Sequence, residues 1–374
     1  MIYDVLVVGA GPSGSTLSKL LSEKGLKVIL IDKEKFPRFK PCAGCISKRA
    51  EKLLPHDFRN VVLNDINSGY LGWKGEILSR ETKMGSPCAF IVSREIFDNY
   101  LLEKAKEKGT QFSDGNPILN IDIFEKKGII SASTKIGEIK ARYLVGADGV
   151  NSRVKKILKI RLPVHYPAYE IFAKFDKPIG SNSALIEIGI LKHGYFWLFP
   201  HGNGICSGIV GRANNNYELK KIFNKIFKKR IQTDINIYKE KGWIVPYKPT
   251  VYNYKNKIFF VGDAAGFCDA LLSEGIYWGI LSAYSLSEAL IKEEPQIYKE
   301  LLSPIKTELF STFVTAKIFY NLQKISFKLS NTTSIIEKFM MTLSGEMTNT
   351  VFLKWLLKQG AKHLLTGKFI KIFY

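Results

Sequence analysis

The sequence lacks long apolar runs and is poor in cysteine. No stretch of about 18 uninterrupted apolar residues occurs, so a transmembrane helix is not expected. The five cysteines are Cys42, Cys45, Cys88, Cys206 and Cys268. They are too few and too scattered for the disulfide framework of a small secreted domain. Residues 1–4 lead straight into an apolar segment, which leaves no room for a signal peptide, so we expect a cytoplasmic protein.

Acidic residues are scarce relative to basic ones. The chain has 55 Lys and Arg against 34 Asp and Glu, which gives a net charge of +21. This excess favours anionic partners such as nucleic acid, acidic lipid headgroups or acidic proteins, although a lysine-rich solvated surface gives the same total. The lysines are not concentrated with stacking aromatic residues and no nucleic-acid-binding motif occurs, so no nucleic-acid partner is expected.

The sequence also shows no internal repeat and no low-complexity linker. At 374 residues the chain is long enough for two domains, or for one large domain with an insert. Its hydrophobic fraction of 46% predicts a substantial core.

Residues 1–33 have the pattern of a strand, a glycine turn, a helix and a second strand. The turn has the spacing Gly9-x-Gly11-x-x-Gly14, directly after an apolar strand. The first glycine allows the tight bend, the second lets a phosphate approach the backbone, and the third lets helix and strand pack closely. The helix N-terminus then offers free N–H groups to a pyrophosphate. Asp32, which closes the second strand, is placed to bind an adenosine ribose, so we predict dinucleotide binding here.

Further along, apolar strands and small-residue turns recur. Arg94 stands at the start of a helix. One apolar strand ends in the turn Gly146-Ala147-Asp148-Gly149, and a later one ends in Gly262-Asp263-Ala264-Ala265. Gly275 then opens an apolar helix, and the chain from about residue 296 is helical and rich in lysine.

In this order and spacing, the motifs resemble the flavoprotein monooxygenase superfamily with the p-hydroxybenzoate hydroxylase fold. Two further segments are similar to the geranylgeranyl reductase branch of that superfamily. They are Phe36-Pro37-Arg38-x-Lys40-Pro41-Cys42 and Gly194-Tyr195-Phe196-Trp197-Leu198-Phe199-Pro200. The branch includes archaeal digeranylgeranylglycerophospholipid reductases and the geranylgeranyl reductases of plants and bacteria.

The resemblance implies an α/β fold with an α+β insert. A Rossmann-type FAD-binding domain would comprise residues 1–68, 89–164 and 252–295. A substrate domain built on an antiparallel sheet would comprise 69–88 and 165–251. Residues 296–374 would form a basic helical region at the C-terminus.

The resemblance also implies FAD as the cofactor, with contacts from several of the motifs. The residues implied to bind it are Gly9, Gly11, Gly14, Asp32, Cys42, Ala43, Arg94, Asp148, Asp263, Gly275 and Ile276. In this scheme Arg94 contacts the pyrophosphate, Asp263 binds the ribityl chain, and the N–H groups of Gly275 and Ile276 face the flavin ring. A structural salt bridge is the alternative for Arg94, and a helix cap is the alternative for Asp263.

The implied reaction is the saturation of prenyl double bonds, which calls for an apolar binding surface. Tyr195, Trp197 and Phe199 alternate along one predicted strand face, so we expect them to line it, unless they only fill the core. Cys42 is the candidate catalytic residue, as a proton donor or a substrate-positioning group, with plain packing as the alternative. A redox pair of Cys42 and Cys45 is a weaker hypothesis, and no metal site is predicted.

The chain departs from the family pattern at several positions. The loop 42–45 reads Cys-Ala-Gly-Cys instead of Cys-Gly-x-Gly, Ala270 and Leu272 replace a proline and a threonine, and His201 replaces a lysine. These departures leave the substrate open. An FAD-dependent aromatic hydroxylase or halogenase is the alternative function on the same fold.

The C-terminal segment 351–374 contains no acidic residue. Its lysines are Lys354, Lys358, Lys362, Lys368 and Lys371. The first three recur every four residues, with Leu353, Leu356, Leu357 and Leu364 facing away. Such a helix suits an anionic membrane surface, so we expect peripheral association with the inner face of the cell membrane, where an isoprenoid lipid substrate is met. A helix packed on the catalytic domain is the alternative. With no second glycine fingerprint, the electron donor is either NAD(P)H or ferredoxin.

Overall fold

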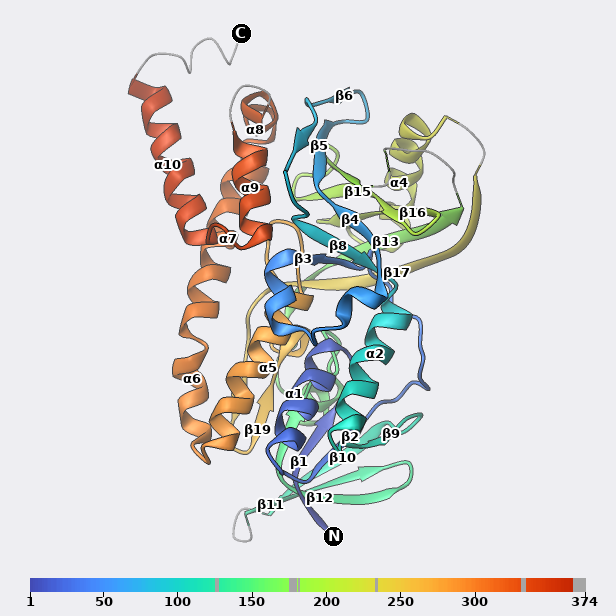
Figure 1. The fold of residues 1–374 in the computed structure, drawn as a ribbon, viewed down its shortest axis with the longest axis vertical. Helices are drawn as coiled ribbons and strands as arrows, with labels where there is room; N and C mark the ends of the chain where they lie inside the picture. The colour runs from blue at the N-terminus through green and yellow to red at the C-terminus, as the bar shows by residue number, and fades with distance from the viewer. Residues whose placement is uncertain (125–127, 175–179, 181, 233–234, 331–333, 366–374) are drawn as a thin grey trace. The chain divides into compact units, whose positions relative to one another are not determined.

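The computed structural model of the chain describes residues 1–124, 128–174, 180, 182–232, 235–330 and 334–365. Contacts within the chain divide it into two compact units. Unit 1 comprises Met1–Lys40, Arg94–His165 and Val245–Lys306, and unit 2 comprises Pro41–Ser93, Tyr166–Ile244 and Thr307–Tyr374. Figure 1 labels the helices and strands of both units.

Unit 1 is built on a mostly parallel sheet with the strand order β10-β11-β12-β1-β2-β9. The strands are β1 (Ile2–Val8), β2 (Val28–Ile31), β9 (Gln111–Ser113), β10 (Ile118–Phe124), β11 (Ile129–Thr134), β12 (Gly137–Gly146), β18 (Asn253–Tyr254) and β19 (Ile258–Phe260). β12 also pairs in parallel with β19, whereas β10 and β11 are antiparallel additions at one edge. Because β1 and β2 are inner parallel strands, their sequences are nearly continuous apolar runs.

Three helices of unit 1 pack side by side. They are α2 (Arg94–Glu107), α1 (Pro12–Glu23) and α5 (Ile276–Ile291), and α1 contacts both of the others (Figure 1). Leu17 and Leu21 of α1 and Leu286 of α5 are buried. The shorter helical elements are α3 (Arg153–Ile157), η4 (Gly262–Ala264), η5 (Pro295–Ile297) and α6 (Tyr298–Leu301).

Unit 2 contains a large sheet with the strand order β17-β13-β16-β15-β14-β5-β6, to which β7 adds beside β5. Its strands are β5 (Ser68–Trp73), β6 (Ile77–Leu78), β7 (Thr82–Lys83), β13 (Val164–Lys174), β14 (Ser183–Ile188), β15 (Gly194–His201), β16 (Gly204–Gly211) and β17 (Asn236–Lys248). A small sheet joins β3 (Cys45–Ser47), β8 (Ala89–Val92) and β4 (Val62–Ile66), next to the 3₁₀ helices η1 (Lys48–Leu53) and η2 (Phe58–Val61).

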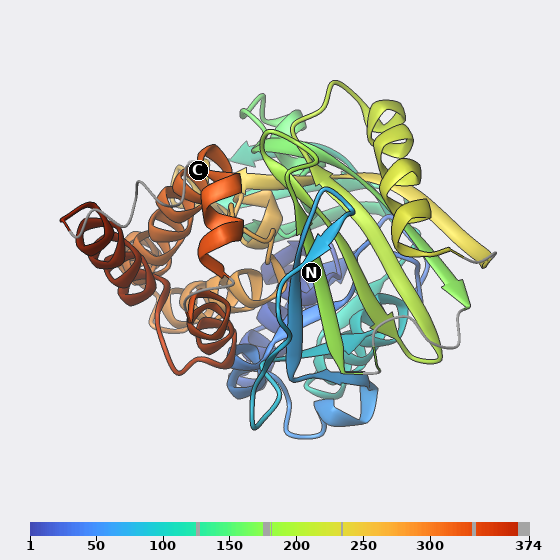
Figure 2. The same cartoon turned by 90° about the horizontal axis from the view of Figure 1, so that it is seen from above.

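One face of the large sheet is covered by α4 (Asn216–Arg230), which Figure 2 shows from above. Phe196 and Leu198 of β15 join Phe223 and Phe227 of α4 in one buried apolar cluster. The side chain of Asn215 caps the helix by accepting a hydrogen bond from the Glu218 N–H at 3.0 Å. Because residues alternate along a strand, the intervening residues of β15 lie on the opposite face of the sheet.

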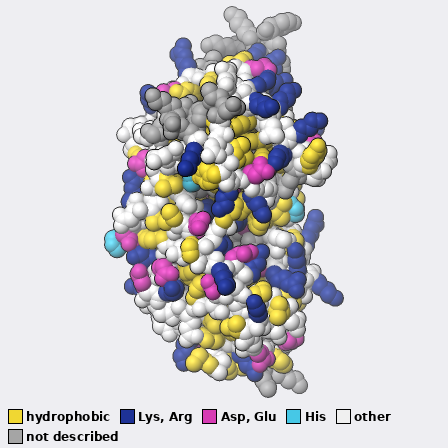
Figure 3. All heavy atoms as spheres, turned by 90° about the vertical axis from the view of Figure 1, so that its right-hand side faces the viewer, with side chains coloured by type: hydrophobic (Ala, Val, Ile, Leu, Met, Phe, Trp, Pro, Cys, Tyr) yellow, Lys and Arg dark blue, Asp and Glu magenta, His cyan; other side chains and the backbone are white. Residues whose placement is uncertain are grey.

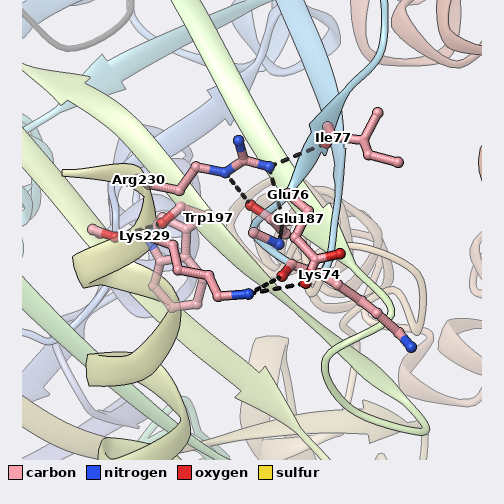
Figure 4. A network of polar contacts seen from close by, with 9 residues as sticks. Lys74, Glu76, Ile77, Glu187, Trp197, Lys229 and Arg230 are labelled. Carbon is pink, nitrogen blue, oxygen red and sulfur yellow. Dashed lines mark hydrogen bonds and ion pairs between the residues drawn. The ribbon is translucent and has the colours of Figure 1, made fainter. Parts of the chain in front are cut away.

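A buried ion pair ties α4 to β14, next to the β5–β6 hairpin (Figure 4). Arg230 donates from Nε and Nη2 to the two carboxylate oxygens of Glu187, at 2.7 and 3.0 Å. Glu187 also accepts a hydrogen bond from the Gly75 N–H, and Arg230 donates to the Ile77 carbonyl at 3.1 Å. Lys229 pairs with a glutamate of the same hairpin at 3.0 Å.

The remaining helices of unit 2 are α7 (Ser303–Asn321), α8 (Gln323–Ser330), α9 (Ile335–Ser344) and α10 (Asn349–Leu365), the first of which begins in unit 1. Gln323 attaches α8 to the β14–β15 hairpin by accepting from the Gly189 N–H at 2.6 Å and donating to the Leu191 carbonyl at 2.8 Å. Glu308 of α7 accepts a hydrogen bond from the Asn349 N–H at the start of α10, at 2.6 Å. Within the described residues, none of the helices combines the length and the apolar character needed to cross a membrane.

The predicted fold class, α/β with an antiparallel-sheet region and C-terminal helices, is confirmed. The two units differ in their boundaries from the domains predicted from the sequence. Residues 41–68 and 89–93, predicted with the FAD-binding domain, group with unit 2, because β3 and β4 pair with β8, and β4 and β8 contact β15 of the large sheet. The helices from residue 307 onward also belong to unit 2 and do not form a third unit.

Candidate active site

The glycine turn after β1 is too tight for a side chain at two of its three glycines. Gly9 has a φ of +105°, and a Cβ there would lie 2.5 Å from the Ala147 carbonyl oxygen. A Cβ on Gly14 would overlap the Gly9 carbonyl oxygen. At Gly11, by contrast, the one described atom within 4 Å of an added Cβ is Nη2 of Arg38, at 3.6 Å. The space in front of Gly11 is therefore open, as the predicted approach of a phosphate requires.

The N-terminus of α1 has no side-chain cap. Gly11 occupies the N-cap position without a side-chain hydrogen bond, and Pro12, which has no N–H to satisfy, follows it. The first-turn N–H groups and the positive end of the helix dipole therefore form an anion-binding site at the end of β1.

Asp32, which follows β2, is hydrogen-bonded to the same turn. Its Oδ2 accepts a hydrogen bond from the Ala10 N–H at 2.7 Å, and its Oδ1 accepts one from the Glu34 N–H at 2.9 Å. The side chain is buried, and this burial raises the pKa of Asp32. The structure thus brings Asp32 to the glycine turn, and its contact with a ribose stays a prediction.

Two arginines of unit 1 share one buried carboxylate. Arg94, the first residue of α2, donates from Nε and Nη2 to Asp98, at 2.7 and 2.8 Å. Arg38 reaches Oδ2 of Asp98 from the loop after β2, at 3.0 Å. The salt bridge considered as the alternative for Arg94 is therefore present, and its predicted pyrophosphate contact stays a prediction.

Asp263 and the N-terminus of α5 lie together. A Cβ on Gly275 would lie 2.9 Å from Oδ1 of Asp263, so this carboxylate packs directly against the Gly275 backbone. Burial raises the pKa of Asp263, while the positive charges of Lys40 and Arg94 oppose the rise. Gly275 is the N-cap of α5, it has no side-chain hydrogen bond, and Ile276 begins the helix. The N-terminus of α5 therefore has no side-chain cap from its N-cap residue.

Asp148 holds α3 in place. Its Oδ2 accepts hydrogen bonds from the Arg153 N–H at 2.6 Å and from the Val154 N–H at 3.1 Å. Its Oδ1 is buried and has no hydrogen-bond partner among the described residues. Burial also raises the pKa of Asp148. The structure therefore gives Asp148 a capping role, and its predicted cofactor contact stays a prediction.

A buried lysine that the sequence analysis did not single out follows in α3. Lys155 has no exposed area, and its Nζ donates to Oγ1 of Thr250 at 2.7 Å. The ammonium group also lies 4.8 Å from the centre of the Phe260 ring, in a cation–π contact. Burial lowers the pKa of Lys155 to about 8, against the opposing charge of Asp148. Nothing in its sequence position distinguishes Lys155 from its exposed neighbour Lys156.

In unit 2, the predicted aromatic residues do share one strand face. Tyr195, Trp197 and Phe199 lie on the face of β15 opposite α4, since none of them joins the cluster that packs on that helix. All three are buried, and the rings of Tyr195 and Trp197 are 5.9 Å apart. A Cβ on Gly208 of β16 would overlap the Trp197 ring, so the indole lies flat across that glycine.

The register between strands adds polar groups to this face. Cys206 is paired with Phe199 on one side and with Phe172 of β13 on the other. Glu170 is paired with Gly208, the residue opposite Trp197. Directly paired residues lie on the same face of a sheet. We call the set of Glu170, Phe172, Tyr195, Trp197, Phe199 and Cys206 the aromatic face.

Cys42 lies in a loop that is fixed to β8. The Gly44 N–H donates to Sγ of Cys42 at 3.4 Å, and the Gly44 carbonyl accepts from the Val92 N–H at 2.9 Å. A Cβ on Gly44, whose φ is +70°, would overlap the Val92 carbonyl oxygen, so the tight approach needs glycine. Ala43, between Cys42 and Gly44 in the chain, is half-buried. Neither Cys42 nor Cys45 forms a disulfide among the described residues.

Cys42 is also close to the aromatic face. Burial raises the pKa of Cys206 well above its ordinary value, and the charges of Glu170 and, more weakly, Cys42 add to the rise. The strand register places Cys206 and Glu170 on one face, and Cys42 interacts with Cys206. Only Cys42 was given a role from the sequence, because Cys206 meets Phe199 through the register of β15 and β16. Among the described residues, no cluster of three or more His, Cys, Asp or Glu has the arrangement of a metal site.

A comparison with protein families identifies the ligand of unit 1. The family model described as FAD binding domain matches residues 2–302, which is most of the chain. The chain belongs to the FAD-binding domain family. FAD is its cofactor, as the motifs predicted.

The fold and the relatives of this flavoprotein agree with the predicted resemblance. The digeranylgeranylglycerophospholipid reductase of Methanosphaerula palustris is 26% identical to it over 313 residues, which cover 78% of this chain and 76% of that protein. The solved structure of a geranylgeranyl bacteriochlorophyll reductase-like protein of Thermoplasma acidophilum has a TM-score of 0.77 at 21% identity, covering 96% of this chain and 95% of that one. A flavin-dependent brominase has a TM-score of 0.73 at 18% identity, covering 97% and 100%. At these identities the two structures show the fold alone.

The residues of unit 1 fit FAD. The open space at Gly11 and the uncapped N-terminus of α1 suit its pyrophosphate. Arg38, in the Phe36-Pro37-Arg38 motif, is one of the residues whose role the sequence did not indicate. Its Nη1 is buried without a partner among the described residues, and its Nη2 lies 3.6 Å from where a Cβ on Gly11 would be. Its position makes it a candidate ligand of the pyrophosphate.

Basic residues of the flavoprotein are spread over its surface in at least one view. Figure 3 shows Lys and Arg side chains distributed among acidic and apolar ones, without one continuous basic stripe on that face. The net charge of +21 belongs to the whole chain, and on this face the basic side chains are dispersed.

Proposed function

We propose that this flavoprotein is a reductase that saturates C=C bonds in geranylgeranyl (isoprenoid) chains, with membrane ether lipid precursors as its substrates. The aromatic face of unit 2 is the observation that carries the proposal, because a prenyl chain is apolar and unsaturated along its whole length. Membership of the FAD-binding family and the name of the relative from Methanosphaerula palustris support the reaction type and the lipid class.

The reaction adds a hydride to one carbon of an isolated double bond and a proton to the other. Reduced FAD supplies the hydride when bound. The chain's own residues have to bind the prenyl group, exclude water and supply the proton. Tyr195, Trp197 and Phe199 present wide, rigid apolar surfaces at low cost in side-chain entropy, which suits the first two tasks.

Cys42 is the proposed proton donor or substrate-positioning group. Its thiol lies in a loop whose shape is fixed by Gly44 and β8, so it has a defined position. Turnover of Cys42→Ser and Cys42→Ala tests this role, and unchanged turnover in both variants removes Cys42 from the mechanism. NAD(P)H and ferredoxin are the proposed alternatives as electron donor, and the rates at which NADH, NADPH and reduced ferredoxin bleach the bound flavin distinguish them.

We also propose that α10 brings the protein to an anionic membrane. Lys354 and Lys358 are exposed on this helix, and so are the apolar side chains of Val351 and Leu357. A helix with both kinds of exposed residue suits the lipid interface. Leu353 and Leu356 are half-buried, as expected for the side that faces the protein. The side chains of Lys362 and Leu364, and residues Lys368 and Lys371, lie outside the described residues.

Liposome co-sedimentation tests the membrane proposal. The variant Lys354→Glu/Lys358→Glu is compared with Lys135→Glu/Lys140→Glu, which makes the same change in net charge at exposed positions of the β11–β12 hairpin. We expect the first to lose most of its binding to vesicles with anionic lipid and the second to keep it. Equal losses would show that net charge alone governs binding.

The central experiment is anaerobic. The purified FAD-loaded protein is reduced with dithionite, geranylgeranyl lipid is added, and flavin absorbance and lipid mass are followed together. We expect reoxidation of the flavin with a gain of about two mass units for each double bond saturated. A lipid with fully saturated chains is the control and should leave the flavin reduced.

The same experiment addresses the alternative function. Flavin that stays reduced with the lipid until oxygen enters would contradict the reductase. That outcome favours an aromatic hydroxylase or halogenase, to which the solved structures are similar in fold.

A further inference from the structure

One buried carboxylate in unit 1 holds the loop between η4 and α5. Oδ1 of Asp269 accepts hydrogen bonds from the N–H groups of Leu271 and Leu272, and Oδ2 accepts one from the N–H of Glu274, each at 2.8 Å. Asp269 is 5% exposed, so water does not compete effectively for these bonds. Hydrogen bonds to a charged acceptor are stronger than those between neutral groups.

The backbone closes the loop around this carboxylate. The Asp269 N–H donates to the Glu274 carbonyl at 3.1 Å, so the two ends of the loop are joined. Within it, Ser273 has a φ of +59°, in the left-handed region that residues other than glycine rarely adopt. The loop therefore depends on the Asp269 carboxylate for its conformation.

The loop ends at the N-terminus of α5, against Asp263. Gly275 follows Glu274 directly, and a Cβ at Gly275 would lie 2.9 Å from Oδ1 of Asp263. The first hydrogen bond of the helix joins the Gly279 N–H to the Gly275 carbonyl at 2.8 Å. Moving the loop by a few tenths of an ångström would either separate Gly275 from Asp263 or drive the two together. The position of the α5 amides is thus set by the loop that Asp269 holds.

We infer that Asp269 is a positioning residue of the flavin site, which fixes the 269–274 loop so that the N–H groups of Gly275 and Ile276 are held ready for the flavin ring. Donors that are already aligned cost no reorganisation when the ring gains negative charge on reduction. The inference rests on FAD as the cofactor and does not depend on which substrate the enzyme reduces.

Two substitutions at Asp269 remove different numbers of the hydrogen bonds that its carboxylate accepts. Asp269→Leu removes all three acceptor contacts. Asp269→Asn keeps one carbonyl oxygen, so it retains at most two of the three. Leu290→Ala is the matched control, because Leu290 is a buried residue of α5 about 20 Å along the helix from Ile276 at 1.5 Å per residue. It removes packing from the same helix and leaves the loop intact.

Hydrogen exchange on the FAD-loaded full chain is the first measurement. We expect the amides of Leu271, Leu272 and Glu274 to exchange at least tenfold faster in Asp269→Leu than in the unmodified chain, with Asp269→Asn between them. Exchange at Gly279 should also rise, because the first turn of α5 loses its support. The control should leave all four amides unchanged.

The dissociation constant and the midpoint potential of bound FAD are the second measurement. We expect about tenfold weaker binding and a more negative potential in Asp269→Leu, smaller changes of the same sign in Asp269→Asn, and values close to the unmodified ones in Leu290→Ala. Protected loop amides in Asp269→Leu would overturn the inference. Faster loop exchange with an unchanged midpoint potential and FAD affinity would overturn it too. In that case Asp269 would hold the loop, but the loop would not affect the bound flavin. No prenyl substrate is used, so failure here is distinct from failure of the proposed function.

Discussion

Asp98 binds the guanidinium of Arg94 through two parallel hydrogen bonds, Nε to Oδ1 at 2.7 Å and Nη2 to Oδ2 at 2.8 Å. The carboxylate has no exposed area, and it also accepts Arg38 at 3.0 Å. Two guanidinium groups therefore meet at one buried carboxylate, and that of Arg38 also lies next to the open space at Gly11. Asp32 and Asp263 interact electrostatically with Arg38 and Arg94, respectively. The pyrophosphate of FAD would be a further anionic partner for Arg38.

Arg38→Met is expected to weaken FAD binding more than it weakens the fold. Hydrogen bonds to charged groups contribute about 1.5–3 kcal/mol, so the dissociation constant should rise by about 10- to 100-fold. Asp98 keeps its bidentate partner Arg94 in this variant, so the melting temperature of the FAD-free chain should change little. Fluorescence titration with FAD is the measurement.

A second arginine provides the control for Arg38. Arg59→Met makes the same substitution in unit 2, where the guanidinium stacks on Phe90 and pairs with Asp65. It should leave FAD affinity unchanged. Arg38→Lys keeps the charge but not the planar set of guanidinium donors. Its FAD affinity should lie between those of the unmodified chain and Arg38→Met. FAD affinity as high in Arg38→Met as in the unmodified chain would exclude Arg38 from the pyrophosphate site.

Local spacing made the glycine turn and the alternation of β15 predictable from the sequence. Gly9, Gly11 and Gly14 lie within one turn, and Tyr195 and Trp197 are two residues apart on one strand, so short-range geometry decides both patterns. The pair Arg94–Asp98 has the i, i+4 spacing of neighbours on a helix face, so its salt bridge was readable too.

Non-local geometry decided the residues that the sequence analysis missed. Arg38 reaches Gly11 because the loop after β2 folds back on the glycine turn, and the sequence does not encode that path in any spacing. Cys206 meets Phe199 through the register of two strands, which the turn between them sets. Lys155 can be buried because Oγ1 of Thr250, distant in the sequence, accepts a hydrogen bond from its Nζ. The grouping of residues 41–68 with unit 2 has the same origin, since β4 and β8 contact β15.

Trp197→Ala and Phe196→Ala should separate substrate binding from core packing. Phe196 belongs to the cluster under α4, so its removal should lower the free energy of unfolding by about 3–5 kcal/mol and leave the KM of the folded enzyme unchanged. Trp197 faces the other way, so its removal should raise the KM for geranylgeranyl lipid by about tenfold or more, as expected for the loss of over 1.4 kcal/mol of binding. Thermal unfolding and steady-state kinetics on both variants are the measurements. An unchanged KM in Trp197→Ala would favour the alternative that this strand only fills the core.

Lys155 should give the fold a specific pH dependence. Burial lowers its pKa from 10.5 in the unfolded chain to about 8 in the folded one. Below pH 8 both states carry the proton, and above about pH 10.5 neither does. Between these values the unfolded chain binds more protons, so the contribution of Lys155 to stability rises with pH, by about 3 kcal/mol over the whole window.

Lys155→Met isolates that dependence. We expect the unfolding free energy of the unmodified chain to rise relative to the variant between pH 8 and 10, and to run parallel to it between pH 6 and 7.5. Lys156→Met replaces an exposed neighbour and should follow the unmodified chain throughout. Denaturant titrations at half-unit pH intervals provide the comparison. Parallel curves for Lys155→Met across the whole range would mean that Lys155 titrates normally.

The ion pair of Glu187 and Arg230 should be the most sensitive polar contact of unit 2. Arg230→Met leaves the carboxylate of Glu187 buried and without its bidentate partner, which costs about 3–5 kcal/mol of unfolding free energy for a buried pair. Lys229→Met breaks an exposed pair with Glu76, which solvent screens, and should change the free energy of unfolding much less. Four of the five tryptophans, Trp73, Trp197, Trp243 and Trp355, lie in unit 2, so tryptophan fluorescence in urea mainly reports its unfolding.

Arg230→Met lowers stability for two reasons: the ion pair is lost, and one unpaired charge stays buried. A double substitution separates these two contributions. Glu187→Gln/Arg230→Met removes both charges and keeps an amide that can still accept from the Gly75 N–H. Because no charge is then left uncompensated, the double variant should recover at least half of the stability lost in Arg230→Met. The loss of stability in the double variant is compared with the sum of the losses in Glu187→Gln and Arg230→Met. If the two are equal, the ion pair does not hold α4 in place. The contact of Arg230 with the Ile77 carbonyl and the packing of its stem then do so.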